Sequence, residues 1–308
     1  MKKIFFTISL LIISILFSLN SYAAGEYNLK YNLKKGDVFK HTSSIDMKIN
    51  MNAIGQDMDI LMNVETTIAI TVINVKNKVY DLEYRYVRFK TSTNNSFMPI
   101  TIDTDNPDDG GLLAEASNIL KAIIDIPIIA KIDKFGNIIS IERVDNLQQA
   151  IIDALNKSDN IMVKQMAELT FKQQFSEKSM KESFEQSFIA YPENPIKIGD
   201  SWNVVSARAL SGIDVKFNMN HTLKALKDNI ATIESTGTVE NEDTSLETPQ
   251  GTIKYAIKGK ILNTTQVNLK NGMTVSGENS MEFDILMDMQ GMEIPMKLSA
   301  KGVLKCEN

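Results

Sequence analysis

The sequence predicts an α+β protein that is mainly β, with two related antiparallel β modules and a central helical insert packed on their sheets. We expect the modules to be curved sheets or a half-barrel. Three observations lead to this prediction. Apolar and polar residues alternate with a period of two along most of the chain, which is typical of strands with one buried face. Residues 106–192 instead carry apolar residues at helical spacing. Short motifs of the first β stretch return in the last one.

These patterns divide the chain into four parts. We expect a signal peptide at 1–23, a first β module at 24–105, a helical insert with a short hairpin at 106–192, and a second β module at 193–308. The insert separates two versions of one β pattern, so we expect the rest of the chain to be organised around it.

The first residues have the features of a cleavable signal peptide. Residues 1–3 are basic at two positions, residues 4–19 form an apolar run, and Ser21 and Ala23 are the small residues that a signal peptidase reads. The run is shorter than the roughly 20 residues of a membrane-spanning helix. No cysteine follows Ala23 to carry a lipid. We therefore expect a periplasmic or secreted protein with no lipid anchor.

Composition excludes several classes of function. The formal net charge of −5 disfavours nucleic acid and anionic membrane surfaces as partners. The one cysteine, Cys306, cannot form an intramolecular disulfide, and two histidines, His41 and His221, offer little to a catalytic triad or a multi-histidine metal site. No Gly-rich phosphate loop or nucleophile elbow is present. We expect a protein that is not an enzyme and needs no cofactor.

The first module is predicted to be an antiparallel meander. Regular alternation runs from Ile45 to Asn52, breaks at Gly55-Gln56 and resumes from Met58 to Val72, which indicates a long hairpin. A further strand covers Val79 to Phe89. Asp103, Asp105, Asp108 and Asp109 then lie in one loop that departs from the calcium-loop pattern, and we expect a solvated acidic loop.

The insert is predicted to hold four helices and one hairpin. The first helix covers Leu112 to Ile123 and ends before Pro127, and a hairpin follows at 128–141. Asp145 begins the second helix with a capping box, and Asp159 begins the third. Ser179 is expected to cap the fourth, whose apolar stripe is Met180, Phe184 and Phe188.

The second module repeats motifs of the first. Gly199-Asp200-Ser201-Trp202 matches Gly36-Asp37-Val38-Phe39, a turn followed by a large aromatic side chain. Residues 217–235 parallel residues 64–82, and residues 287–294 resemble residues 51–58 in a different order along the chain. These matches indicate a duplicated β module.

Methionine is unusually frequent on the predicted strands, where Val and Ile are normally preferred. Three interpretations stay open: an ordinary packed core, a deformable apolar groove whose thioether chains repack around ligands, or soft-metal binding to Cu(I) by Met287, Met289 and Met292. The residues concerned are Met47, Met51, Met58, Met62, Met219, Met281, Met287, Met289, Met292 and Met296.

The chain resembles an uncharacterised family of secreted Bacteroidota proteins, known as a domain of unknown function. The matching segments are the signal peptide, Tyr31 to Phe39, the hairpin around Gly55-Gln56, Lys131 to Ile138, and Gly199 to Trp202. Members of that family often begin with a lipidated cysteine, which this chain lacks. More distantly, the pattern looks like the half-barrel carriers that move lipoproteins and lipids across the periplasm. That resemblance implies an apolar ligand.

Our functional prediction is a non-enzymatic exported protein that binds a lipid or another apolar ligand between sheet and helices. The alternative is a structural or interaction protein of the cell envelope with a dry core and an envelope protein as partner. Copper binding by Met residues is a minor alternative. The predicted lining residues are Leu113, Ile119, Leu120, Ile123, Met162, Met166, Met47, Met51, Met287 and Met289.

Overall fold

The computed structural model describes residues 25–53, 56–94, 100–106, 111–157, 176–210, 213–241, 244–248, 251–289 and 291–307. The predicted signal peptide, the tip at Gly55, the third predicted helix, and Asp108 and Asp109 of the acidic loop lie outside these residues. Strands make up 66% of the structure and helices 13%, which confirms the mainly β fold class.

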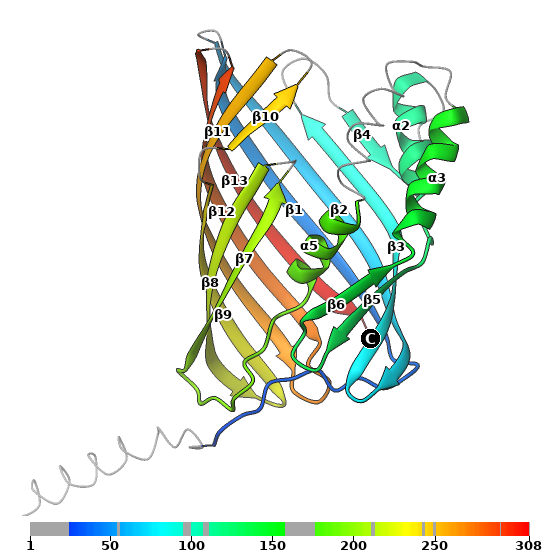
Figure 1. Cartoon of the computed structure of the whole chain (residues 1–308), viewed down its shortest axis with the longest axis vertical. Coiled ribbons are helices and arrows are strands. Elements are labelled where there is room, and N and C mark those ends of the chain that lie inside the picture. Colours follow the sequence, from blue (N-terminus) through cyan, green and yellow to red (C-terminus); the bar gives the residue numbers. More distant parts are fainter. Residues whose placement is uncertain are drawn as a thin grey trace, which may run out of the picture.

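The strands form one antiparallel sheet, in the order β6-β5-β3-β2-β1-β13-β12-β11-β9-β8-β7, with β4 paired to β3 and β10 to β11. Pairing of β1 with β13 joins the two predicted modules into a single sheet, which the sequence had left open. The sheet is strongly curved (Figure 1). The strands are β1 (Val38–Ala53), β2 (Gln56–Lys76), β3 (Val79–Asn94), β4 (Ile100–Asp103), β5 (Ile128–Asp133), β6 (Ile138–Glu142), β7 (Ser201–Leu210), β8 (Ile213–Lys227), β9 (Ile230–Glu240), β10 (Thr244–Thr248), β11 (Gly251–Asn268), β12 (Thr274–Met289) and β13 (Met292–Glu307).

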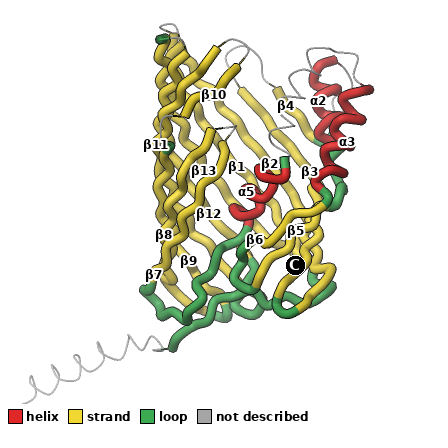
Figure 2. Tube along the Cα trace, in the orientation of Figure 1, coloured by secondary structure: helices red, strands yellow, loops and turns green. Residues whose placement is uncertain are grey.

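The insert contributes to the sheet as well as covering it. Its β5–β6 hairpin extends the sheet beyond β3. The described helices are α2 (Gly111–Lys121), α3 (Val144–Lys157) and α5 (Glu177–Ser187). Helix α2 packs against β4 and α3, while α5 contacts both β6 and β7, the two ends of the strand order. In Figure 2, α5 accordingly lies in front of the curved sheet, between its two margins.

Helix α5 begins earlier than its sequence suggested. Its N-cap is Ser176, in extended conformation, and the backbone N–H of Ser179 donates to the Ser176 hydroxyl at 3.1 Å. The prediction of Ser179 as the cap was therefore wrong by one turn, because Ser179 is the residue whose free amide is capped. The predicted helical stripe is confirmed for Met180 and Phe184, which are buried on α5. Phe188 is also buried, but it is the C-cap in extended conformation and does not belong to the helix.

The repeated Gly-Asp motif makes the same turn in both halves of the sheet. The N–H of Gly36 donates to the Val72 carbonyl at 2.8 Å, and that of Gly199 to the Leu223 carbonyl at 2.7 Å. Both glycines have φ near +90°, a conformation that other residues resist. In each turn the Asp carboxylate accepts from the backbone N–H three residues earlier, at 2.8 Å. These matching bonds support the predicted duplication.

One end of the sheet is packed with side chains from its strands, the N-terminal segment, the β5–β6 hairpin and α5. We call it the core end. The N-terminal segment crosses it: the N–H of Tyr31 donates to the Lys134 carbonyl at 2.8 Å, and that of Asn32 to the Asn271 carbonyl at 3.0 Å. The Tyr31 ring contacts the rings of Phe188 and Tyr191. Figure 1 shows this segment running beneath the turns of the sheet. The core end is therefore closed by long-range contacts.

Candidate functional site

The two faces of the sheet differ in chemistry, and the helix side is the apolar one. Phe39 and Ile70 are buried together with Phe184 of α5, so we call this side the inner face. Strand residues alternate between faces, and β1 pairs in unbroken register. Met47 and Met51 therefore share the inner face with Phe39, while Asp46 and Lys48 lie on the opposite, outer face.

Beyond the core end, the inner face of β1, β2, β12 and β13 is apolar and mostly half-buried. We call this part the far half. Directly paired residues such as Met47 and Met62, or Met47 and Ala300, continue one face across neighbouring strands. The half-buried apolar residues of the far half on β1, β2, β12 and β13 are Ile45, Met47, Ile49, Met51, Met58, Ile60, Met62, Val64, Met281, Phe283, Ile285, Met287, Met289, Met296 and Leu298.

The structure divides the predicted lining residues. Met47, Met51, Met287 and Met289 lie on the far half, on β1 and β12, with β13 between them. Ile119 and Ile123 are buried in the main core cluster, and Leu120 is half-buried on α2. Met162 and Met166 lie outside the described residues, and the Leu113 side chain is also not described. The structure therefore brings the strand methionines onto one face but places Ile119 of α2, and Ile123 just after α2, in the core.

A row of polar side chains interrupts the apolar inner face, and sequence reasoning did not find it. Asn279 of β12 pairs with Asn263 of β11, Asn263 pairs with Ser235 of β9, and Ser235 pairs with His221 of β8. We call these four residues the polar belt. Direct pairing places their side chains on the same face of neighbouring strands, within reach of one another. His221 was considered from the sequence only as a candidate member of a catalytic triad or metal site, and the two Asn residues belong to no sequence motif.

The belt lies between two apolar clusters. Leu223 and Ile233, two residues away along β8 and β9, belong to the core-end cluster. Phe217 and Val239, on the other side along the same strands, belong to a second cluster. The belt is therefore a polar row that separates two apolar clusters of the inner face.

One end of the belt is fixed by contacts with the core end. The His221 Nδ1 and the Ser235 hydroxyl lie 2.7 Å apart, and the His221 ring stacks on Trp202 with centroids 5.2 Å apart. The Trp202 indole N–H donates to the Ala190 carbonyl at 2.8 Å. Burial lowers the pKa of His221 to about 4, so the imidazole is neutral at physiological pH.

The other end of the belt has unused hydrogen-bonding capacity. The Oδ1 atoms of Asn263 and Asn279 are buried and have no hydrogen-bond partner in the part of the chain that the structure describes. Gly302 lies opposite Asn279, and a Cβ at Gly302 would come within 2.5 Å of that oxygen. The glycine thus leaves room for the Asn279 side chain.

His41, at the core end, is a buried histidine, whereas His221 is half-buried. The His41 side chain is 4% exposed, burial lowers its pKa to about 4, and its Nε2 has no hydrogen-bond partner among the described residues. It pairs with Ile68 on one side and Cys306 on the other. The described residues contain no group of three or more His, Cys, Asp or Glu side chains that could hold a metal ion.

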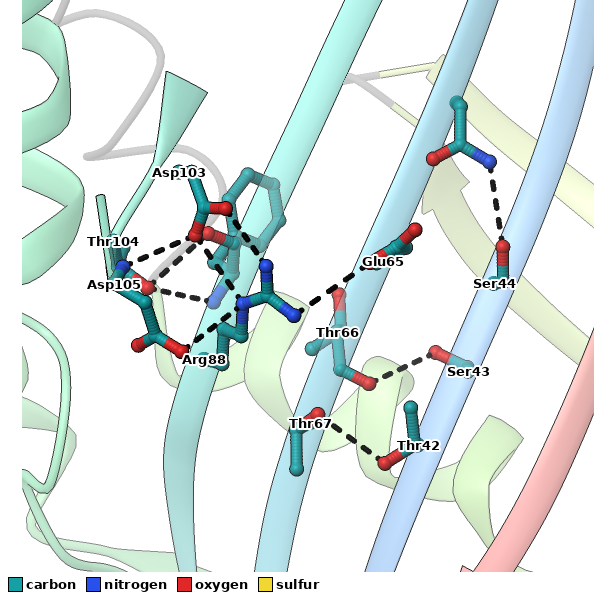
Figure 3. Close-up of polar contacts among 12 residues, drawn as sticks. Thr42, Ser43, Ser44, Glu65, Thr66, Thr67, Arg88, Asp103, Thr104 and Asp105 are labelled. Atoms are coloured by element: carbon teal, nitrogen blue, oxygen red, sulfur yellow. Dashed lines mark hydrogen bonds and ion pairs between the residues drawn. The ribbon is translucent and has the colours of Figure 1, made fainter. Parts of the chain in front are cut away.

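The outer face is polar, and part of the predicted acidic loop is tied to it. Arg88 of β3 donates to both oxygens of Asp103, at 2.7 and 3.2 Å, and contacts Asp105 and Glu65 (Figure 3). Asp103 is only 8% exposed, and the neighbouring Arg88 lowers its carboxyl pKa. The prediction of a solvated loop was therefore wrong for Asp103, because Arg88, on the directly paired strand β3, is its partner.

Two hollows also lie on the outer face. The first, of about 790 Å³, is lined by triplets of consecutive strand residues whose first and third members point outward, as Asp46 and Lys48 do around Met47. The second, of about 550 Å³, shares Ser280 and Glu282 with the first. Together they form a shallow trough across the strands, and we call it the outer trough. Its side chains are mostly polar, with charges of both signs.

No helix among the described residues has the length and apolar character needed to cross a membrane.

Several solved structures resemble this chain distantly. The chain is similar to a lipovitellin structure solved to study lipid–protein interactions, with a TM-score of 0.49 and 10% identity over 90% of this chain; it spans 26% of the lipovitellin chain. It is also similar to an exported protein with a YmcC-like fold from Bacteroides fragilis (TM-score 0.16, 8% identity, 91% and 100% covered). A Vibrio parahaemolyticus domain assigned to outer membrane lipoprotein sorting gives a TM-score of 0.14 and 9% identity, with 84% and 83% covered.

No curated protein matches the chain. A family model does match, from residue 77 to residue 274, and it is described as a family of unknown function, DUF6263. The matched segment runs from the turn after β2 to the start of β12, so it includes the whole insert and most of the second module. It covers more than half of the chain, and this protein therefore belongs to the DUF6263 family of unknown function.

Proposed function

We propose that this protein is an exported, non-enzymatic binding protein that holds a lipid or another apolar ligand against the far half of its inner face. The observation that carries the proposal is the half-buried apolar surface on β1, β2, β12 and β13, which continues the face of a packed core. Removing apolar side chains from water lowers the free energy, and a bound apolar ligand would complete their burial.

Methionine suits such a surface better than Val or Ile does. Its side chain is unbranched and has three rotatable bonds, so it repacks around ligands of different shape. Met47, Met62 and Met281 lie in one row across the inner face, on β1, β2 and β12. We therefore expect the protein to accept acyl chains of several lengths.

The test compares two neighbouring residues of β2 that face opposite ways. Met62 lies on the inner face, and Leu61 lies on the outer face with 48% of its surface exposed. Protein is purified gently from its host envelope and examined by native mass spectrometry, followed by organic extraction. We expect lipid adducts on the unaltered protein and on Leu61→Gln, and fewer adducts on Met62→Gln. A clean mass that stays unchanged after incubation with membrane lipids would rule out the proposal.

The outer trough favours a second candidate function, an interaction protein of the cell envelope. Leu61 borders the first hollow and Leu262 the second, and both are exposed large apolar residues within a polar surface. Such residues suit contact with another protein surface. A photo-crosslinking amino acid at position 262 should capture a partner of defined mass in the host envelope. A matched probe at Val303, an exposed position outside the trough, should capture none.

A further inference from the structure

We infer that the polar belt recognises the head group of the bound lipid, and that this head group is uncharged and donates hydrogen bonds through hydroxyl groups. A monoacylglycerol has this chemistry. The inference rests on the proposed function, since it names the class of ligand that the inner face would hold.

The first step is the continuity of the belt. Asn279, Asn263, Ser235 and His221 are direct neighbours on four adjacent strands. Neighbouring strands lie about 4.8 Å apart, so the belt extends across roughly 14 Å of the inner face. A head group that carries several hydroxyl groups could contact two or three of its members at once.

The second step is the direction of the hydrogen bonds. The Oδ1 atoms of Asn263 and Asn279 are acceptors without donors among the described residues. A buried acceptor without a donor is unfavourable, and a ligand that brings a donor relieves that cost. The Ser235 hydroxyl is already engaged with His221. The Asn side of the belt, on β11 and β12, is therefore the side where hydroxyl or amide donors of a ligand would be favourable.

The third step is charge. The belt contains no carboxylate and no permanent cation, and its histidine is neutral at physiological pH because burial lowers the His221 pKa to about 4. Charged neighbours along the same strands, such as Glu278 and Glu234, alternate with belt residues and lie on the outer face. A charged head group placed on the belt would be buried without a counter-ion, which is strongly unfavourable. The belt thus favours a neutral head group.

The fourth step is the path of the acyl chain. The next inner-face row beyond the belt holds Met281 and Ile261, directly paired, followed by the half-buried Phe283. The row on the opposite side leads into the packed core, where Ile233 and Leu223 are fully buried. A ligand anchored by its head at the belt therefore extends its acyl chain along the methionine rows of the far half, away from the core end.

The experiment uses the full protein, stripped of bound lipid, and three ligands that share one acyl chain. Monoolein carries two hydroxyl donors, methyl oleate carries none, and oleate is charged. We expect monoolein to bind at least about tenfold more tightly than methyl oleate, because a site built for a hydroxyl group discriminates against the analogue that lacks it. We also expect it to bind more tightly than oleate at neutral pH.

Variants test whether the preference for monoolein over methyl oleate depends on the belt residues. Asn263→Leu should bind methyl oleate as well as the unaltered protein does and should lose most of the preference for monoolein. Thr264→Leu, at the adjacent exposed position on the outer face, should keep that preference. Gly302→Ala should also weaken it, since the added methyl group displaces the Asn279 side chain.

The outcomes separate the two proposals. Equal affinity for monoolein and methyl oleate, or tighter binding of oleate, would overturn the belt inference and leave lipid binding intact. Failure of all three ligands to bind would overturn both. The ligand series on the unaltered protein decides the matter even where a variant does not fold, and Asn263→Ala provides a second, less bulky replacement.

Discussion

The core end and the far half are built from the same strands, yet one is a packed core and the other a half-buried surface. On β1, Phe39 is buried while Met47 and Met51 are half-buried. On β2, Ile70 is buried while Met58 and Met62 are half-buried. The period-two pattern is the same in both parts. What differs is the presence of α5, the β5–β6 hairpin and the N-terminal segment over the core end.

The comparison shows that alternation along a strand selects a face but does not say what covers it. Aromatic and branched side chains gather where other elements pack, as Phe184 does against Tyr84 with ring centroids 4.5 Å apart. The half-buried methionines lie on the far half of the inner face, away from the core end.

The strongest test removes a core-end side chain and a far-half side chain in turn. Phe184→Ala should lower the free energy of unfolding by about 3–5 kcal/mol, because it leaves a cavity in a buried aromatic cluster. Met62→Ala should cost about 1–2 kcal/mol, since its side chain is only half-buried. Urea unfolding measures both, with Phe184→Leu as a milder variant if Phe184→Ala does not fold. Equal losses at the two positions would remove the distinction.

The second test uses acid on the core end. The unfolded His41 takes up a proton near pH 6.5, whereas the folded residue does so only near pH 4, because burial lowers its pKa. His41 therefore does not reduce the free energy of unfolding above about pH 6.5. As the pH falls from 6.5 towards 4, that free energy decreases by roughly 3 kcal/mol. In His41→Leu, the decrease in the free energy of unfolding between pH 7 and 4 should be smaller by about 3 kcal/mol. An unchanged pH profile in this variant would contradict the effect.

The third test concerns the ion pair that fixes β4 to β3. Asp103→Asn should lower the free energy of unfolding by about 1–2 kcal/mol, because Arg88 then loses a bidentate, nearly buried carboxylate. Since Arg88 lowers the pKa of Asp103, the pair stabilises the fold above about pH 4 and is lost in stronger acid. The control is Asp105→Asn, whose carboxylate is 56% exposed and which should change stability by at most about 0.5 kcal/mol.

The smallest effect is expected in the belt itself. Asn263→Leu should leave thermal stability unchanged or slightly raised, because it removes a buried acceptor that has no partner among the described residues. Thermal unfolding followed by circular dichroism is sufficient. A clear loss of stability would mean that Asn263 supports the fold, and the belt would then resemble the core end rather than a ligand surface.

Local patterns predicted much of the fold. The Gly-Asp turns at Gly36 and Gly199 were recognised from residue type, because a positive φ favours glycine. The β5–β6 hairpin followed from the turn at 133–137, where the Asp133 side chain accepts from the N–H of Phe135 at 2.8 Å. Helix α5 was predicted with the wrong cap because both Ser176 and Ser179 suit that role and only the backbone geometry separates them.

The candidate site was less accessible to sequence reasoning. Met47 and Met287 were selected for their chemistry and do lie on the inner face, but Ile119 and Ile123 share the same apolar character and are core residues. The polar belt was missed because its members come from residues 221 to 279. Only the pairing register of four strands makes them neighbours.

The sequence alone was sufficient to predict the long hairpin and third strand of the first module, the short hairpin of the insert, the repeated turns and the mainly β fold class, because each depends on spacing between near neighbours in the chain. Only the tertiary structure decided that both modules join in one sheet through β1 and β13, that α5 contacts β6 and β7, and that Asp103 is paired with Arg88. These features depend on register and packing between distant segments, and free energy from burial and pairing across the whole fold selects them.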